Sequence, residues 1–520
     1  MAKISSTLSS QKATVPLPQK PTNLPVSFTK SDHRWMFLVL AACSLLNLWP
    51  LFYFHYLPFM DQPSHLLKEN ILAHFNSPDF NYSQFFCVNT LPAPNLLNDY
   101  LTAGLGQFFP IDVASRIAVG LALFALPLSV GFYLLKNRPG TEPWALLAIP
   151  MVWSRFLFFG NENFCLAVPL LFIFLGLLGS WDSNYSWRKN AAFLALATLI
   201  YFSHFLVFAV LGLSLTLHFA LGKWNVRTAL LHFIPVLPGS LLAFFWFWKK
   251  GSGGEPLRWS FNLLEKLQAF SEALCPTPWG PAVQSIAWQC FCISMLILFC
   301  VQAYRLWSEP SFQSTILLVL CSCGIALCLQ RWTIIFIPDQ RMWWMSLLMG
   351  LVLLPCLTKK NLVSLGVFSI PLAIGTSIAA GSIFAVPDKQ LSMLESTFAT
   401  FPKGLRLIYF GDPSLPPHLH RAFEYYHLRK GGRTTQHLIG KDQSIDFKKG
   451  DFMPPAREGF GMYDFSATAW IPYLDEFDGA LIIGDSSKAS NEIISALTNK
   501  GYRVATTGSI TLLLNPKTVK

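Results

Sequence analysis

A run of charged and polar residues follows directly on the first long apolar segment of the chain. The stretch PFMDQPSHLLKENIL, residues 58–72, places Asp61, His65, Lys68 and Glu69 within nine residues of one another. Charges at the end of an apolar segment cost free energy unless water, a partner or a substrate solvates them. A carboxylate here could take a proton from a bound hydroxyl group, and neighbouring cations could neutralise a developing negative charge.

Helical spacing would bring three of these side chains to one face of a helix. Asp61, His65 and Glu69 follow one another at i, i+4 and i+8, and Lys68 lies beside that face. The sequence D-x-P is also typical of a helix start, where aspartate caps free N–H groups and proline is tolerated. Two interpretations stay open: Asp61 caps the helix above a solvated face, or the same face carries a catalytic group.

The composition of the chain indicates a polytopic membrane protein. Of its 520 residues 52% are hydrophobic and 13% are charged, whereas soluble domains carry roughly 25% charged residues. The net charge of +11 does not indicate nucleic-acid binding, because short basic stretches beside apolar segments carry much of the excess. These stretches, at 136–138, 187–190, 222–227 and 358–361, fit cytoplasmic loops under the positive-inside rule.

About eleven apolar runs are long enough to span a membrane or to form membrane hairpins, given that a straight span needs ~20 residues. They lie at 36–54, 112–135, 143–160, 163–181, 191–203, 206–221, 228–248, 285–306, 313–330, 342–357 and 362–386. If residues 1–34 form a disordered cytoplasmic tail, all four basic stretches fall inside and the loop 55–111 falls outside. We therefore expect a membrane domain over residues 35–386 that is almost entirely helical.

The remaining part, residues 387–520, has regular charges of both signs and is predicted to form an extracytoplasmic soluble α/β domain. The segments 405–412, 479–485 and 509–515 have the pattern of strands, and 486–501 has that of an amphipathic helix with a terminal glycine. No phosphate-binding loop sequence follows either Gly-Asp turn. We expect a folded domain without its own catalytic site.

Further polar residues fall at the predicted outer ends of the apolar segments, and each has a structural alternative. Arg155 lies inside an apolar segment and can snorkel to the interface, and His204 can be a packing histidine. Asp339 and Arg341 can pair with each other. In the first loop, Asn95 and Asp99 can cap a helix over 96–109. As functional groups, all of these would be candidates for substrate binding.

The stretch DQPSHLLKENIL resembles the D-Y-P-N-H-L-A-R element that follows the first span in a group of bacterial membrane proteins, with D-x-P-x-H-L in common. Four further stretches fit the same pattern in order and spacing: PNLLNDYL (94–101), GNENFCLAVPL (160–170), YFSHFLV (201–207) and IPDQRMWW (337–344). That group is similar to the GT-C glycosyltransferases, polytopic enzymes that use polyprenyl-phosphate-linked sugars. The resemblance covers residues 35–390 and implies a GT-C-like bundle of about 11 transmembrane helices.

The resemblance implies transfer of a sugar from a polyprenyl-phosphate donor to an extracytoplasmic glycan, lipid or protein acceptor. In that superfamily an acid in the first extracytoplasmic loop is catalytic, and this position is Asp61, the expected general base. His65 and Glu162 are further catalytic candidates. The substrate-binding candidates are Lys68, Asn95, Asp99, Arg155, His204, Arg331, Asp339 and Arg341. The expected location is the bacterial inner membrane, with a cytoplasmic N-terminus and an extracytoplasmic C-terminal domain.

The sequence departs from this pattern next to the expected base. Gln62 and Ser64 replace the usual Tyr and Asn, and Gln62 stands where many members carry a second acid. No cofactor is therefore certain, a divalent ion (Mg²⁺ or Mn²⁺) stays open, and Glu162 is the alternative second acid. A transporter or lipid flippase is the alternative function, because intramembrane charges also mark transport pathways. A non-catalytic scaffold is a third.

Overall fold

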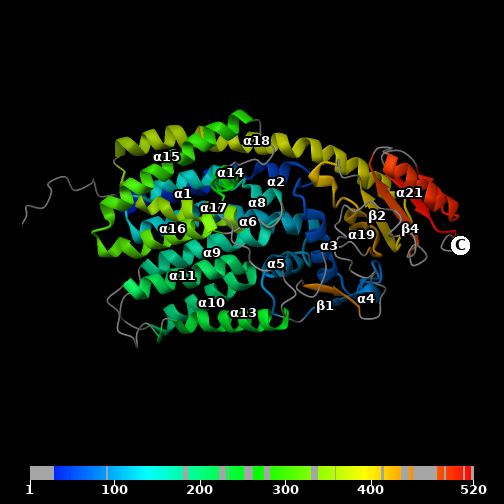
Figure 1. Cartoon of the computed structure of the whole chain (residues 1–520), viewed down its shortest axis with the longest axis horizontal. Coiled ribbons are helices and arrows are strands. Elements are labelled where there is room, and N and C mark those ends of the chain that lie inside the picture. Colours follow the sequence, from blue (N-terminus) through cyan, green and yellow to red (C-terminus); the bar gives the residue numbers. More distant parts are fainter. Residues whose placement is uncertain are drawn as a thin grey trace, which may run out of the picture.

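A computed structural model gives the architecture of the protein. It describes residues 29–89, 92–179, 186–221, 230–231, 233–250, 262–274, 282–328, 338–357, 359–411, 415–434, 444–448, 477–484, 488–506 and 510–516. Long helices lie side by side over most of the molecule, and a small sheet lies at one end of the bundle (Figure 1). The first loop, with helix α3, lies between the bundle and that sheet.

The bundle is built from apolar helices around an apolar core. Its main helices are α1 (Lys30–Asn47), α6 (Ile111–Asn137), α9 (Glu162–Gly179), α10 (Trp187–Ser203), α11 (Phe205–Leu221), α13 (Leu237–Lys250), α14 (Leu263–Leu274), α15 (Ala282–Leu306), α16 (Pro310–Cys328), α17 (Pro338–Gly350) and α18 (Lys359–Ala399). In the described part of the chain, α6, α9 and residues 364–399 of α18 are long and apolar enough to cross a membrane. Phe244, Phe245 and Trp248 of α13 remain exposed, as expected for side chains that face lipid.

The predicted apolar run 143–160 is interrupted in the structure, whereas two short runs each form one helix. The run 143–160 is divided into η1 (Glu142–Leu147), α7 (Ala148–Met151) and α8 (Arg155–Phe158), and prolines at positions 143 and 150 favour such breaks because they donate no backbone hydrogen bond. The short runs 191–203 and 206–221 form α10 and α11. These two helices meet at His204, whose extended backbone (φ −162°, ψ 122°) separates them.

The C-terminal part contains a four-stranded sheet in the order β2-β4-β6-β5. The strands are β2 (Leu407–Gly411), β4 (Gly479–Ile483), β5 (Arg503–Thr506) and β6 (Ile510–Leu514), with α21 (Lys488–Asn499) between β4 and β5. Strands β2 and β4 are parallel and the other pairs are antiparallel. The strands and the helix predicted here are thus present. Helix α18 continues beyond position 386 to Ala399, so a single helix leads from the bundle towards the sheet (Figure 1).

The first loop and the C-terminal part form a joint layer over the end of the bundle. The loop contains α3 (Gln62–Ala73), α4 (Tyr82–Phe85), β1 (Phe86–Val88) and α5 (Leu97–Leu105). Strand β1 pairs antiparallel with β3 (Ile445–Phe447), and α19 (Glu424–Lys430) packs against α3. The Tyr82 hydroxyl accepts from Asn70 at 2.8 Å and donates to the His427 carbonyl at 3.1 Å. These contacts fix α3 between two distant parts of the chain.

Candidate active site

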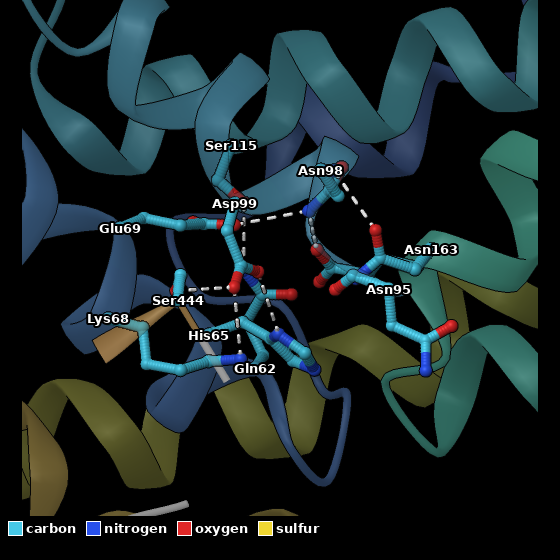
Figure 2. A network of polar contacts seen from close by, with 11 residues as sticks. Gln62, His65, Lys68, Glu69, Asn95, Asn98, Asp99, Ser115, Asn163 and Ser444 are labelled. Atoms are coloured by element: carbon cyan, nitrogen blue, oxygen red, sulfur yellow. Dashed lines mark hydrogen bonds and ion pairs between the residues drawn. The ribbon is translucent and has the colours of Figure 1, made fainter. Parts of the chain in front are cut away.

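Helices α3, α5 and α9 bring a group of polar side chains together where the first loop meets the bundle (Figure 2). We call this group the polar network. Its members come from α3, from α5 and the segment just before it, from α6, from α9 and from the segment before β3: Gln62, His65, Lys68, Glu69, Asn95, Asn98, Asp99, Ser115, Glu162, Asn163 and Ser444.

The charged centre of the polar network is the buried carboxylate of Asp99. The Lys68 ammonium lies 3.4 Å from its Oδ2, and the Ser444 hydroxyl donates to the same oxygen at 2.7 Å. His65 Nδ1 is 3.8 Å from Oδ1, too far for a hydrogen bond. Burial alone would raise the pKa of Asp99, but Lys68, then His65 and Ser444, lower the pKa to about 2. Asp99 is therefore ionised at neutral pH.

A second centre of the polar network is a pair of buried glutamates that share one amide. The Asn98 Nδ2 group donates to Glu69 Oε1 at 3.1 Å and to Glu162 Oε2 at 2.7 Å. Asn163 holds Asn98 in place, because its Oδ1 accepts from the Asn98 backbone N–H at 3.0 Å. Burial, followed by the charges of Glu162 and Asp99, raises the pKa of Glu69 well above its usual range. Glu69 thus favours its protonated form.

The raised pKa of Glu69 predicts a pH-dependent loss of stability. Because its folded-state pKa lies above the ~4.3 of an unfolded chain, folding stability falls as the pH rises between the two values. Glu69→Gln removes this titration and keeps an oxygen for Asn98. We expect its unfolding temperature in detergent to fall less than that of the wild type between about pH 5 and pH 8. Glu309→Gln, at an exposed position, is the control. Equal slopes for wild type and Glu69→Gln would contradict this prediction.

The hairpin tip at residues 160–163 connects the polar network to Asp61 and to a second group of charges. Glu162 and Asn163 contact Asn98, and Asn161 Oδ1 accepts from the Arg341 guanidinium. Gly160 packs against Asp61: its φ is +82°, and an added Cβ would lie 2.8 Å from Asp61 Cβ. A glycine is required here both for the backbone conformation and for the close approach.

Gly160→Ala is expected to destabilise the protein by about 1–3 kcal/mol, because alanine disfavours this φ and has no room. The substitution should also displace Asp61. Thermal unfolding in detergent measures the loss. Gly104→Ala in α5 is the matched control, since nothing lies within 4 Å of its added Cβ and alanine is favoured in helices. Equal unfolding temperatures for the two variants would contradict the assigned role of Gly160.

Asp61 occupies the N-cap position of α3, but its carboxylate does not cap the helix. Instead Oδ1 accepts from Arg421 Nε at 2.8 Å, because a guanidinium forms a stronger charge-assisted bond than a backbone N–H does. The capping interpretation is therefore wrong. The solvated-face interpretation is wrong as well, since α3 is buried from Gln62 to Ile71 against α5 and α19. Asp61 itself keeps 13% of its side chain exposed.

The second group of charges joins α8, α14 and α17. Arg155 contacts Glu272 at 2.6 Å, and Glu272 also accepts from Gln340 at 2.8 Å. The Lys266 ammonium lies 3.5 Å from Asp339. These two ion pairs tie α14 to α8 and to α17.

A histidine between α10 and α11 completes this group. Arg341 NH1 lies 3.2 Å from His204 Nε2, and the same guanidinium reaches Asn161. Arg341 and Asp339, for which mutual pairing was an alternative, thus have separate partners, His204 and Lys266. Positions two apart on a helix do not face each other, which is why they diverge.

The structure distributes the predicted site residues over these groups. His65, Lys68, Asp99 and Glu162 meet in the polar network, and Asn95 contributes its carbonyl to Asn163. The predicted site residues that do not belong to the polar network are Asp61, Arg155, His204, Asp339 and Arg341. Arg331 is not among the residues that the structure describes. Neither Asn95 nor Asp99 caps α5, which begins at Leu97 without a side-chain cap.

Several residues of these groups were not expected from the sequence. Glu69 was recognisable as the i+8 member of the Asp61 face, but it was not assigned a role. Lys266, Glu272, Arg421 and Ser444 carried no signal, because their partners lie tens to hundreds of residues away in the chain.

A divalent metal ion does not fit the surroundings of Asp61. Its carboxylate is already paired with a cation, Arg421. Within the ranges that the structure describes, no three His, Cys, Asp or Glu side chains gather as metal ligands. Divalent hard cations need several oxygen ligands, and a single carboxylate that is held by an arginine does not supply them.

The comparison with known proteins gives the fold. No protein-family model and no curated protein matches the sequence. Two solved structures of ArnT from Cupriavidus metallidurans are similar over 93% of this chain and 98% of theirs. The apo structure has a TM-score of 0.55 at 11% identity, and the structure bound to undecaprenyl phosphate has 0.54 at 10%. The chain therefore has the fold of ArnT, and three of its described helices are long and apolar enough to cross a membrane, as expected from the sequence.

Proposed function

We propose that the protein is an integral membrane glycosyltransferase that moves a sugar from a polyprenyl-phosphate-linked donor to an extracytoplasmic acceptor. The observation that carries this proposal is the placement of a partly exposed acid, Asp61, beside the hairpin tip of a chain with the fold of ArnT. One similar ArnT structure holds undecaprenyl phosphate. We further propose a bacterial inner-membrane location, with the N-terminus in the cytoplasm and the C-terminal part outside.

Asp61 is the acid best suited to act as the general base. Glu69 and Asp99 are fully buried and Glu162 is 2% exposed, whereas 13% of the Asp61 side chain is exposed. A base must reach the proton that it removes. Arg421 occupies Oδ1 of Asp61, which leaves Oδ2 to face an acceptor. The geometry supports Asp61 in this role more strongly than it supports the three buried acids.

The proposed reaction is a single displacement that inverts the configuration at the anomeric carbon of the sugar. The acceptor oxygen forms a bond to the anomeric carbon while the bond from that carbon to the phosphate oxygen breaks. Asp61 takes the acceptor proton, and the polyprenyl phosphate leaves with the electron pair. The developing charge on the phosphate needs a cation in place.

Arg155 is the proposed contact for the donor phosphate. Its helix, α8, ends two residues before Gly160, which packs on Asp61. Its side chain is 15% exposed, and its partner Glu272 is 20% exposed, so an anionic lipid headgroup can compete for this arginine. Arg341, at 5% exposure and held by His204 and Asn161, is more deeply enclosed. We assign Arg341 to holding the hairpin tip in place.

Binding of undecaprenyl phosphate to the purified protein, followed by transfer of radiolabelled sugars from polyprenyl-phosphate donors, tests the proposal. We expect saturable binding of undecaprenyl phosphate, and we expect undecaprenol, which lacks the phosphate, not to displace it. We also expect the radiolabel to appear in an extracytoplasmic acceptor. Absence of phosphate-dependent binding would overturn the proposal. Movement of the lipid across reconstituted vesicles without sugar transfer would instead support the transporter or flippase alternative.

A further inference from the structure

Four side chains form a closed ring that joins the start of α3 to the residues at the start of α19. Arg421 donates from Nε to Asp61 at 2.8 Å and from NH1 to Glu424 at 3.2 Å. Ser64 donates to the same Glu424 oxygen at 2.8 Å. Because Ser64 lies three residues after Asp61 on α3, the contacts return to their starting point. Ser64, Arg421 and Glu424 are buried, and Asp61 is partly exposed.

The ring makes the position of the Asp61 carboxylate depend on the C-terminal part of the chain. An aspartate at an N-cap normally turns its carboxylate to the backbone N–H groups of its own helix, and Asp61 gives up that bond. Glu424 fixes one side of the guanidinium, and the guanidinium fixes one oxygen of Asp61. The planar fork of arginine sets direction as well as distance, so the free oxygen of Asp61 acquires a defined orientation.

We propose that Arg421 is a positioning residue for Asp61, and that the C-terminal part thereby completes the active site. This inference rests on the proposed function. An acceptor, a base and a third group that orients the base recur together in active sites where the base must take a proton. Here these would be the bound acceptor, Asp61 and Arg421. A general base that is misplaced by about 1 Å can lose about 10²-fold in rate. Arg421 would act through Asp61 without contact to either substrate.

A second arginine of the same region provides a matched control. Arg429 of α19 also bridges two carboxylates, Asp112 of α6 at 2.8 Å and Glu395 of α18. Like Arg421, it ties the C-terminal part to helices of the rest of the protein. Its partners do not include Asp61. Substitution of Arg429 therefore removes a comparable structural connection and leaves the proposed orientation of the base intact.

The experiment compares Arg421→Gln and Arg421→Lys with Arg429→Gln in the full-length protein. The readouts are kcat and KM for the donor per folded molecule, with folding checked by size-exclusion chromatography and thermal unfolding in the same detergent. We expect Arg421→Gln to lose about 10²-fold in kcat with KM changed less than about twofold. Arg421→Lys, which keeps the charge but not the fork, should fall between Gln and wild type. Arg429→Gln should lower the unfolding temperature but keep kcat within about threefold.

Chemical rescue covers the case in which Arg421→Gln folds poorly. Millimolar guanidinium should restore part of the kcat of Arg421→Ala and should leave Arg429→Ala unchanged. If Arg421→Gln loses no more kcat than Arg429→Gln while the wild type is active, the inference is wrong and the proposed function stands. If the wild type neither binds undecaprenyl phosphate nor transfers sugar, the proposed function fails, and the inference fails with it.

Discussion

Asp61→Asn is expected to reduce sugar transfer by roughly 10²–10⁴-fold, the usual contribution of a general base. An amide cannot take the acceptor proton, but its oxygen can still accept from Arg421 Nε, so the ring and the fold should persist. The initial rate of transfer from a radiolabelled polyprenyl-phosphate donor in membranes measures the loss. The amount of protein is determined by immunoblotting of the same membranes, so that a fall in rate is not confused with a fall in expression.

Asp79→Asn is the matched control for this substitution. Asp79 is an exposed acid in the same loop, and the contact that the structure shows for it is a backbone N–H donated to Ser77. We expect the Asp79 variant to keep full activity. If Asp61→Asn retained more than about a tenth of wild-type transfer, a value well above the range for loss of a base, Asp61 would not be the base and the proposed mechanism would be wrong.

Lys68→Met is expected to destabilise the protein by about 3–5 kcal/mol, the usual cost of removing one partner of a buried ion pair. Lys68 is 1% exposed and its partner Asp99 is fully buried. Without the ammonium, Asp99 keeps the Ser444 hydroxyl but loses the principal group that lowers its pKa. Unfolding in mixed detergent micelles, followed by intrinsic tryptophan fluorescence, measures the change in unfolding free energy.

A double substitution separates the charge effect from the loss of packing. Because Asp99→Asn removes the carboxylate that Lys68 balances, Lys68→Met together with Asp99→Asn should recover most of the lost stability. Lys403→Met, at an exposed position, serves as a control and should change stability by less than about 0.5 kcal/mol. A double variant as unstable as Lys68→Met alone would show that the loss does not come from the unpaired Asp99.

Much of the fold follows from local rules that act along the chain. Apolar runs longer than a membrane is thick predict spans, and α6, α9 and α18 form where such runs occur. Short apolar stretches bounded by turn residues predict β2, β4 and β6. The helix that starts at Gln62 follows from the proline in its first turn. The length of the apolar run 143–160 predicts one segment, but the structure has three short helices there, because prolines at positions 143 and 150 interrupt the run.

The side chains of α3 show where prediction from the sequence ends. Spacing correctly placed His65 and Glu69 on one helix with Asp61 at its start, but it could not give their separate partners. Asp61 pairs with Arg421, 360 residues further along the chain, whereas Glu69 shares Asn98 with Glu162. Such pairs form because burial makes an uncompensated charge costly, whatever the distance in sequence. Which charges are buried together depends on how the helices pack.

By itself, then, the sequence determined that the chain crosses a membrane, that α3 follows the first apolar segment, and that an acid stands at the start of α3. Only the tertiary structure decided what that acid does. Local chemistry favoured a helix cap for Asp61, since backbone N–H groups are its nearest donors in the chain. Packing of α19 against α3 brought a guanidinium to the carboxylate, and a charged donor binds a carboxylate more strongly than a neutral one does.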